Sequence, residues 1–414
     1  MIDDLIQSLE QLAVFMALYD NPVFVAFLEM LKCYRKETLE GQEAGFLKAV
    51  ARFTGLLYNQ KTDDWSTYLT NTILSMETCL SFVAATEFEL PERMINTAMA
   101  ELQALSFAAQ ISPDTLRLVG RKGWRAARVD LQAQYLDRLM HLDQYGTGIF
   151  TQGHMFRLDM RKPDKLLVIK SPDPITFRTL YGYQAQHEEI IRNTKALLHN
   201  LPCSNLLLYG DAGTGKSASI KAVCNQFADE GLKLIEVSKN DLDELPDLLD
   251  RLSREPLKFI LYIDDLSFGE NDDSFSSLKA ILEGSASARS KNTVIYATSN
   301  RRHLVKESLA ARSGDDVHRR DTMQETLSLS QRFGLCLFFE KPSAQEYLDL
   351  VHQIFDEYKV LQEAAQENFD PEAFEQEAEA FALRHGGRSA RAARQFVEIE
   401  AAKKGLAKLE RNEA

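Results

Sequence analysis

The chain has 414 residues, enough for two or three domains with cores of their own. With 45% hydrophobic and 26% charged residues, the composition is that of a globular protein and excludes disorder on a large scale. The net charge of −13 argues against broad, nonspecific nucleic-acid binding. No apolar run approaches the roughly 18 to 20 residues that span a bilayer, so we expect no membrane partner.

The amino terminus and the cysteines indicate the compartment. MIDDLIQSLEQ carries acidic residues where a signal peptide carries basic ones, so we expect a cytoplasmic protein. The five cysteines include no C-x-x-C pair, which favours reduced thiols over a disulfide framework or a zinc site.

Residues 1–145 predict an all-helical N-terminal domain. In LIQSLEQLAVFMALY the apolar residues recur at helical spacing and predict one buried stripe: Leu5, Leu9, Leu12, Phe15 and Met16. The helical pattern breaks at a few polar or proline-containing pairs: Asn21-Pro22, Asp63-Asp64 and Leu90-Pro91. Ser112-Pro113-Asp114 is a plausible cap at which a further helix begins.

Basic residues gather near the end of this domain, in TLRLVGRKGWRAARVDL around Trp124. They are Arg117, Arg121, Lys122, Arg125 and Arg128. If a helix continues through Gly123, positions 117, 121, 125 and 128 share one face. A nucleic-acid or phosphate patch is one interpretation, and the acidic balance of the chain favours an ordinary solvated or interdomain face.

The pattern then changes from helical to β-rich. GTGIFTQGHMFRLD and KLLVIKSPDP predict a strand pair that acts as a connector over residues 146–172. Four apolar runs follow over 173–341, LLLYG, LKLIEV, FILYID and TVIYATSN, and helical segments separate them. Buried parallel strands that alternate with helices predict an α/β fold, a three-layer αβα domain. Residues 342–414 are helical again and predict a small lid domain.

The first of these runs leads into the pattern G-x-x-x-x-G-K-[ST], and an apolar strand before it and a helix after it argue against a chance match. Backbone N–H groups of such a loop converge on phosphates at the positive end of the following helix. Lys216 is expected to reach the β- and γ-phosphates, and the Ser217 hydroxyl to ligate Mg²⁺. The predicted nucleotide-binding residues here are Gly210, Asp211, Ala212, Gly213, Thr214, Gly215, Lys216, Ser217 and Ala218.

Polar residues follow the next strands. Asp264 is expected to hold Mg²⁺ through water, and Asp265 to sit where a base or water-orienting group is needed. Asn300 ends the strand TVIYATSN, so we expect it beside the γ-phosphate, where it can position water. The histidines show no metal-ligand spacing, so Mg²⁺ is the one metal expected.

These motifs, in this order, resemble the AAA+ ATPase superfamily from about Asp173 to the C-terminus. The resemblance makes the glycine-rich loop Walker A, Asp264-Asp265 Walker B and Asn300 sensor 1. It makes Arg332, in LSLSQRFGL, the arginine finger that reaches a neighbouring subunit's nucleotide, and Arg388, in RHGGRSARAARQFV, the sensor 2 arginine.

The resemblance also extends upstream of the loop. DPITFRTLYGYQAQ is similar to the segment that cups the adenine, with Leu180, Tyr181 and Gly182 nearest. Within AAA+, strings such as SPDPITFRTLYGYQAQ, IDDLSFGENDDSFSSLKAILEG and YATSNRRHLV look most like bacterial predicted ATPases carried as a domain-of-unknown-function family.

Two departures affect the functional hypothesis. Most AAA+ motors have Glu where this chain has Asp265, whose side chain is one methylene shorter, so slow hydrolysis is an open alternative to fast turnover. SKNDLDELPDLLDRLSREP also lacks the aromatic-hydrophobic-Gly loop with which unfoldases grip polypeptide.

The leading hypothesis is therefore a Mg²⁺-dependent ATPase that converts ATP to ADP as a homo-oligomer, with the site shared between subunits, and that remodels or regulates a protein partner held by the helical N-terminal domain. The alternative is an ATP-dependent assembly switch or loader with little turnover; nucleic acid is a possible client of that alternative and is not favoured. Residues 301–330, rich in Arg and His, predict either a subunit, phosphate or partner contact or a solvated insertion.

Overall fold

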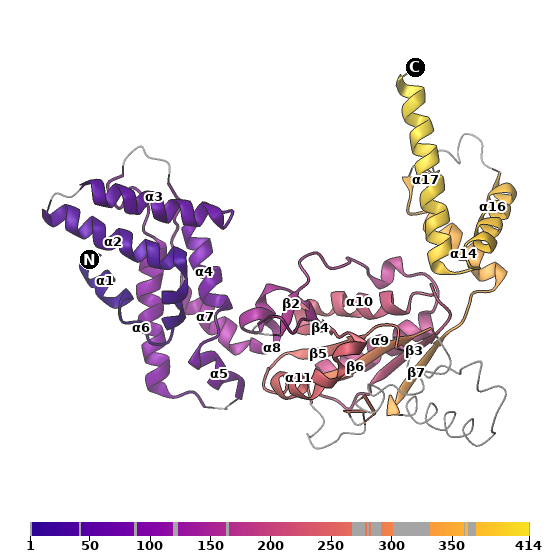
Figure 1. Cartoon of the computed structure of the whole chain (residues 1–414), viewed down its shortest axis with the longest axis horizontal. Helices are drawn as coiled ribbons and strands as arrows, with labels where there is room; N and C mark the ends of the chain where they lie inside the picture. Colours follow the sequence, from indigo (N-terminus) through magenta and orange to yellow (C-terminus); the bar gives the residue numbers. More distant parts are fainter. Residues whose placement is uncertain are drawn as a thin grey trace. The chain divides into compact units, whose positions relative to one another are not determined.

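The computed structural model describes the chain except for residues 1, 41–42, 87–88, 119–122, 163–164, 267–277, 280, 283–290, 301–331, 360, 363–369 and 414. The chain divides into two compact units, coloured in sequence order in Figure 1. The first comprises Met1–Gln152 with Arg254–Leu257, and the second comprises Gly153–Ser253 with Lys258–Ala414. Each unit has a hydrophobic core of its own.

The first unit is helical, as the sequence predicts. Its α-helices and short 3-10 helices (η) are α1 (Ile2–Leu9), η1 (Met16–Asp20), α2 (Pro22–Glu40), α3 (Glu43–Asn59), α4 (Trp65–Ser75), α5 (Cys79–Thr86), α6 (Glu92–Ala109), α7 (Leu131–Met140), α8 (Leu142–Tyr145) and η2 (Gly148–Gln152).

The helix starts in this unit follow the predicted breaks. Helix α2 begins at Pro22, α4 begins after Asp64, and α6 begins after Pro91. The Asp64 carboxylate accepts a hydrogen bond from the N–H of Thr67, as an N-cap should. The predicted helix start at Ser112-Pro113-Asp114 is wrong, because the chain forms turns there and the next helix is α7.

The residues of the apolar stripe predicted near the amino terminus do not lie on one continuous helix, because a buried glutamate binds the backbone between them. Helix α1 ends at Leu9, and Glu101 of α6 accepts hydrogen bonds from the backbone N–H groups of residues 13–15. These bonds hold the chain in a non-helical turn, since the N–H groups are satisfied by a carboxylate and not by a helix. Four of the five stripe residues are buried, and Met16 is exposed.

The condition for a shared helical face of basic residues, a helix that continues through Gly123, is not met in the described part of this segment, and Arg121 and Lys122 lie outside the described residues. Arg125 lies in extended backbone, where its N–H donates to the Asp63 carbonyl at 2.7 Å and its guanidinium pairs with the Asp63 carboxylate. Trp124 is buried and donates its indole N–H to the Ile111 carbonyl at 2.7 Å. The backbone pairing of Arg125 with Asp63 and Asp64, about 60 residues earlier in the sequence, therefore holds this segment in an extended conformation instead of a helix.

The second unit is built on a seven-stranded sheet with the order β2-β1-β4-β5-β6-β3-β7. The strands are β1 (Met155–Leu158), β2 (Leu166–Val168), β3 (Leu206–Gly210), β4 (Leu232–Glu236), β5 (Lys258–Ile263), β6 (Thr293–Ser299) and β7 (Leu335–Phe339). All neighbours are parallel except β1 and β2. The expected strand pair β1–β2 is present and forms an edge of this sheet instead of a separate connector.

The strands β3, β4, β5 and β6 are the four predicted apolar runs, whereas β7 was not predicted. The chain runs from β3 past two strands to β4, and from β4 back to β5, so right-handed crossovers place α10 (Lys216–Gln226) and α11 (Leu245–Leu252) on opposite faces. Helix α9 (Gln184–Leu198) packs beside α10 over the same core. The predicted three-layer αβα fold is therefore confirmed.

The 3-10 helices among the described residues of this unit are η3 (Phe177–Thr179), η4 (Ala228–Glu230) and η5 (Lys239–Glu244).

The strand order determines where the polar residues after the strands meet. Strands β5, β6 and β3 are adjacent and parallel, so the segments that follow them leave the same edge of the sheet.

A helical lid follows the sheet, as predicted. It contains α14 (Ala344–Phe355), α16 (Pro371–Arg384) and α17 (Ala390–Glu413). Ser343 and Glu346 form a capping box on α14, and Asp370 caps α16. No helix among the described residues is long and apolar enough to cross a membrane.

Candidate nucleotide site

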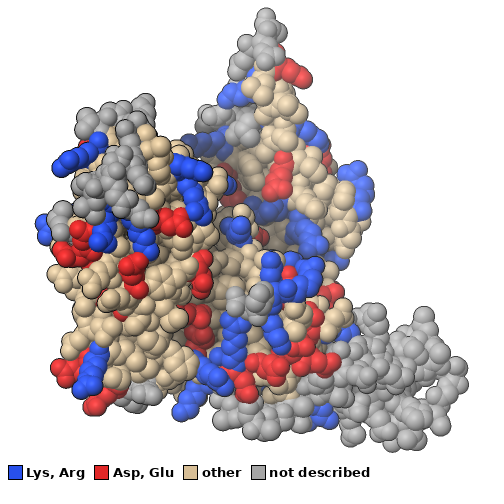
Figure 2. Space-filling model, turned by 60° about the vertical axis from the view of Figure 1, so that its left-hand side comes forward, with Lys and Arg blue, Asp and Glu red and all other residues tan. Residues whose placement is uncertain are grey.

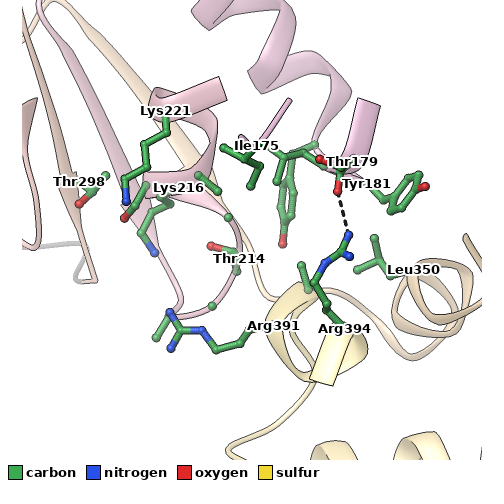
Figure 3. Close-up of a pocket in the computed structure, with 18 of the residues that line it drawn as sticks. Ile175, Thr179, Tyr181, Thr214, Lys216, Lys221, Thr298, Leu350, Arg391 and Arg394 are labelled. Atoms are coloured by element: carbon green, nitrogen blue, oxygen red, sulfur yellow. Dashed lines mark hydrogen bonds between the residues drawn. The ribbon is translucent and has the colours of Figure 1, made fainter. Parts of the chain in front are cut away.

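A cavity of about 490 Å³ lies where β3, β5 and β6 end and α17 begins. Residues 212–218 of the glycine-rich loop line one wall, and Asp264, Asp265, Thr298 and Asn300 line the end near the sheet. Figure 3 shows the loop with Thr214 and Lys216 between Thr298 on one side and α17 on the other. The volume is within the range of small-molecule sites.

The loop keeps its shape through two positions that require glycine. Gly210 has a φ of +135°, and a Cβ there would collide with the Phe339 carbonyl of β7. Gly213 has a φ of +77° and lies against Ser389 at the start of the lid. Gly210 and Asp211 do not line the cavity; the Asp211 carboxylate accepts the Lys341 N–H at 3.1 Å and joins the loop to the segment after β7.

Lys216 is a buried cation at the first turn of α10. It is 5% exposed, and its Nζ donates to the carbonyl oxygens of Gly210 at 3.1 Å and Asp211 at 2.5 Å. Burial lowers the pKa of Lys216, and the carboxylates of Asp211, Asp265 and Asp264 oppose that shift. Because its hydrogen bonds go to neutral carbonyls, the ammonium group keeps a net charge that can attract an anion.

Ser217 and Asp264 meet at the sheet end of the cavity. The Ser217 Oγ donates to Asp264 Oδ1 at 2.8 Å, and Thr298 Oγ1 donates to the same oxygen at 2.6 Å. Burial raises the pKa of Asp264, and the hydroxyl donors led by Thr298 outweigh this effect, so the net shift is downward. Thr298 was not predicted, although a hydroxyl two residues before Asn300 points to the same face of the strand.

These groups fit a magnesium ion. An anionic carboxylate and a hydroxyl within 2.8 Å supply the oxygen ligands that Mg²⁺ prefers, and such ions usually take one or two carboxylates plus phosphates. Among the described residues there is no group of three or more His, Cys, Asp or Glu that could hold a metal without help from a substrate.

Asp265 and Asn300 come from adjacent strands and are hydrogen bonded. The Asn300 Nδ2 donates to Asp265 Oδ1 at 2.8 Å. Asp265 has a φ of +50°, unusual for a residue with a side chain, and Thr298 Oγ1 accepts its N–H at 2.9 Å. The two residues are thus brought together in the lining of the cavity.

The opposite end of the cavity is more apolar. Leu180 and Tyr181 line it, whereas Gly182 lies outside and borders a neighbouring hollow at the start of α9. The apolar side chains that complete this end are Ile175, Leu350 and Ile354. In Figure 3 Arg394 reaches from α17 to the Thr179 carbonyl, which it contacts at 3.1 Å.

The lid arginines differ from the prediction. Arg388 does not line the cavity, and its Nε donates to the Glu379 carboxylate at 2.9 and 3.0 Å. Arg391 lines the cavity instead, and its backbone N–H donates to the Gly213 carbonyl at 3.2 Å. Figure 3 shows Arg391 extending along the glycine-rich loop.

Arg332 lies away from this cavity. It precedes β7, whose first residue, Leu335, is paired with Leu206 at the start of β3. Gly210 is four residues further along β3, or about 13 Å at the usual rise per strand residue. Arg332 is therefore at the opposite edge of the sheet from the loop. The predicted insertion over 301–330 lies outside the described residues.

His187 also lines the cavity and was not predicted. It comes from α9, is 7% exposed, and its Nε2 lies 3.1 Å from Ser219 Oγ of α10. Burial lowers the pKa of His187 to about 4, so the ring is neutral at pH 7. It joins α9 to the helix that follows the loop.

One comparison with known proteins gives a match. A family model described as "Protein of unknown function (DUF815)" matches residues 151–404, which begin two residues before the second unit and include the loop, both aspartates and the lid arginines. No curated protein matches the chain. Since the match covers more than half of its length, the chain belongs to the DUF815 family of proteins of unknown function.

Proposed function

We propose that this protein is a Mg²⁺-dependent ATPase of the AAA+ type. One observation carries the proposal: a buried lysine, a hydroxyl–carboxylate pair and a carboxylate–amide pair from three adjacent strand ends meet at one cavity. They are Lys216, Ser217 with Asp264, and Asp265 with Asn300. Each pair suits a different part of a nucleoside triphosphate.

The residues divide the chemistry between them. Lys216 and the N–H groups at the start of α10 bind the phosphates, and Ser217 and Asp264 hold the metal. Bound Mg²⁺ would neutralise charge on the β- and γ-phosphates. Asp265 orients the attacking water and accepts its proton, and Asn300 fixes the carboxylate through the 2.8 Å hydrogen bond.

The apolar end of the cavity suits a nucleobase. Tyr181, from the segment before α9, offers a flat surface at this end, and Leu350, from α14, offers an aliphatic one. Adenine is the base that the AAA+ resemblance implies, so ATP is the proposed substrate and ADP the product.

The position of Arg332 supports a homo-oligomer. At the far edge of its own sheet it cannot reach its own cavity, yet an arginine that stabilises transferred phosphate charge must touch the γ-phosphate. A neighbouring subunit that presents Arg332 would supply that contact. The helical first unit is then the proposed site for a protein partner.

An assembly switch with little turnover is the second candidate, and the short side chain of Asp265 favours it. A nucleic-acid client is not favoured: Figure 2 shows basic and acidic side chains interspersed on the visible face, and the net charge is −13.

The test is binding of a fluorescent ATP analogue, with phosphate release measured in parallel. Lys216→Ala should abolish tight binding, because the phosphates lose the loop's cation. Lys233→Ala is the matched control: Lys233, on β4, is 6% exposed and donates to the Gly153 carbonyl at 3.2 Å, outside the cavity. Equal binding by the parent and Lys216→Ala would refute the site.

A further inference from the structure

Tyr262 lies directly beneath the proposed metal site. It is on β5, two residues before Asp264, so both side chains point to the same face of the strand. The ring is 1% exposed and packs in the core between the sheet and the helices α9 and α10.

The Tyr262 hydroxyl makes no aligned hydrogen bond with any described residue, although the oxygen is fully buried. Tyr296, its register partner on β6, provides a direct contrast. The Tyr296 hydroxyl lies 2.8 Å from Thr194 Oγ1 and accepts from Asn193 Nδ2 at 3.1 Å. A buried polar group without a partner costs about 1–3 kcal/mol, so an orphan beside a partnered neighbour requires an explanation.

The side chains around the Tyr262 hydroxyl indicate which group it would bind. Asp264, Ser217 and Thr298 are the polar side chains that interact with the phenol. Asp264 Oδ1 already accepts from Ser217, from Thr298 and, at 3.2 Å, from the Asp265 N–H. One carboxylate oxygen therefore takes three well-aligned donors, whereas the phenol lies beside the same carboxylate without an aligned hydrogen bond.

The hydrogen bonds that Asp264 accepts would change when the site holds a cation. Asp264 and Ser217 would hold the cation, and the Asp264 carboxylate would then need a hydrogen-bond donor on its other side to fix its orientation. Tyr262 is the buried hydroxyl placed to give it.

We propose that Tyr262 is a positioning residue for the divalent cation, whose hydroxyl donates to the Asp264 carboxylate in the loaded site. This inference rests on the proposed function. It requires no change in the ionisation of the phenol. Loss of a hydrogen-bond partner behind a metal ligand typically costs 10- to 100-fold in metal affinity, which sets the expected effect.

The test compares Tyr262→Phe with Tyr296→Phe in the full chain, because each removes one buried hydroxyl from neighbouring positions of the sheet. Mn²⁺ binding is followed by the loss of the free-ion EPR signal in the presence of a non-hydrolysable ATP analogue. Binding of a fluorescent ATP analogue in EDTA gives the metal-free affinity. Both are measured below each variant's unfolding midpoint.

Tyr262→Phe should weaken Mn²⁺ binding by about 10- to 100-fold and leave the metal-free affinity unchanged. Tyr296→Phe should change neither. Unaltered Mn²⁺ binding in Tyr262→Phe would overturn the proposal, as would an equal loss of metal-free affinity, which would show a general packing role. A parent protein that binds no nucleotide would instead overturn the proposed function, and the tyrosine role with it.

Discussion

Replacing Arg391 with alanine tests which lid arginine contacts the nucleotide. Arg391 lines the cavity from the first turn of α17, and among the described residues no acidic side chain pairs with its guanidinium. Its charge also contributes to the lowered pKa of Lys216, after burial as the main cause. Two cations that repel each other across a cavity both gain when an anion enters, so we expect phosphate to contact both.

The size of the effect follows from the contact. A hydrogen bond to a charged group is worth about 1.5–3 kcal/mol, which corresponds to a rise in Kd of roughly 12- to 150-fold. Arg388→Ala is the matched control, three residues away. It removes a partly exposed ion pair with Glu379, whose side chains are 35% and 23% exposed, so it should cost the lid about 0.2–1 kcal/mol of stability and leave nucleotide affinity unchanged.

The assay is titration of a fluorescent ATP analogue at fixed Mg²⁺, with urea unfolding of each variant alongside. The reasoning is refuted if Arg388→Ala weakens binding while Arg391→Ala does not. That outcome would mean that the turn before α17 rearranges when the site is loaded, so that Arg388 enters the cavity.

Three further predictions concern Asp265, Arg332 and His187. Asp265→Asn should still bind ATP and slow phosphate release by at least roughly a hundredfold; an unchanged turnover number would remove this carboxylate from the mechanism. Arg332→Ala should bind ATP and be nearly inactive, and mixing it with Lys216→Ala should restore some activity through mixed interfaces; no rescue, together with turnover independent of protein concentration, would show that each subunit acts alone. Because the pKa of His187 is about 4 in the folded chain and about 6.5 when unfolded, the unfolded state binds its proton first, and stability should fall from pH 6.5 toward pH 4. His187→Gln should reduce that fall by about 2 kcal/mol between pH 7 and pH 5 in urea unfolding, whereas identical pH slopes would contradict the burial argument.

The sheet end of the site could be predicted because short-range patterns determine it. A buried run that ends in Asp264-Asp265 and another that ends in Asn300 place polar groups at strand ends, and a parallel sheet brings such ends together. The second strand's Thr298 was missed, since a threonine in a strand is common and only the neighbouring strand reveals its partner.

At the lid end of the site, the sequence could not predict which arginine lines the cavity. Gly386 and Gly387 both adopt positive φ values, and this turn decides that α17 starts at Ala390. Three residues span about 300° of a helix, so positions 388 and 391 would lie within about 60° of each other, and the residue at which the helix starts decides which of the two reaches the cavity. In the first unit, the pairing of Arg125 with Asp63 was equally invisible, because it joins residues far apart in the sequence.

Helix α17 has two faces with separate tasks. One packs inside the lid through Ala392, Ala393, Phe396 and Val397, while the other turns Arg391, Arg394 and Gln395 to the cavity. Side chains on a rigid helix move together, so a change of volume in the lid interior alters the reach of arginines on the other side. Natural variation at those interior positions is therefore a route by which homologues could adjust nucleotide affinity while every cavity residue stays the same.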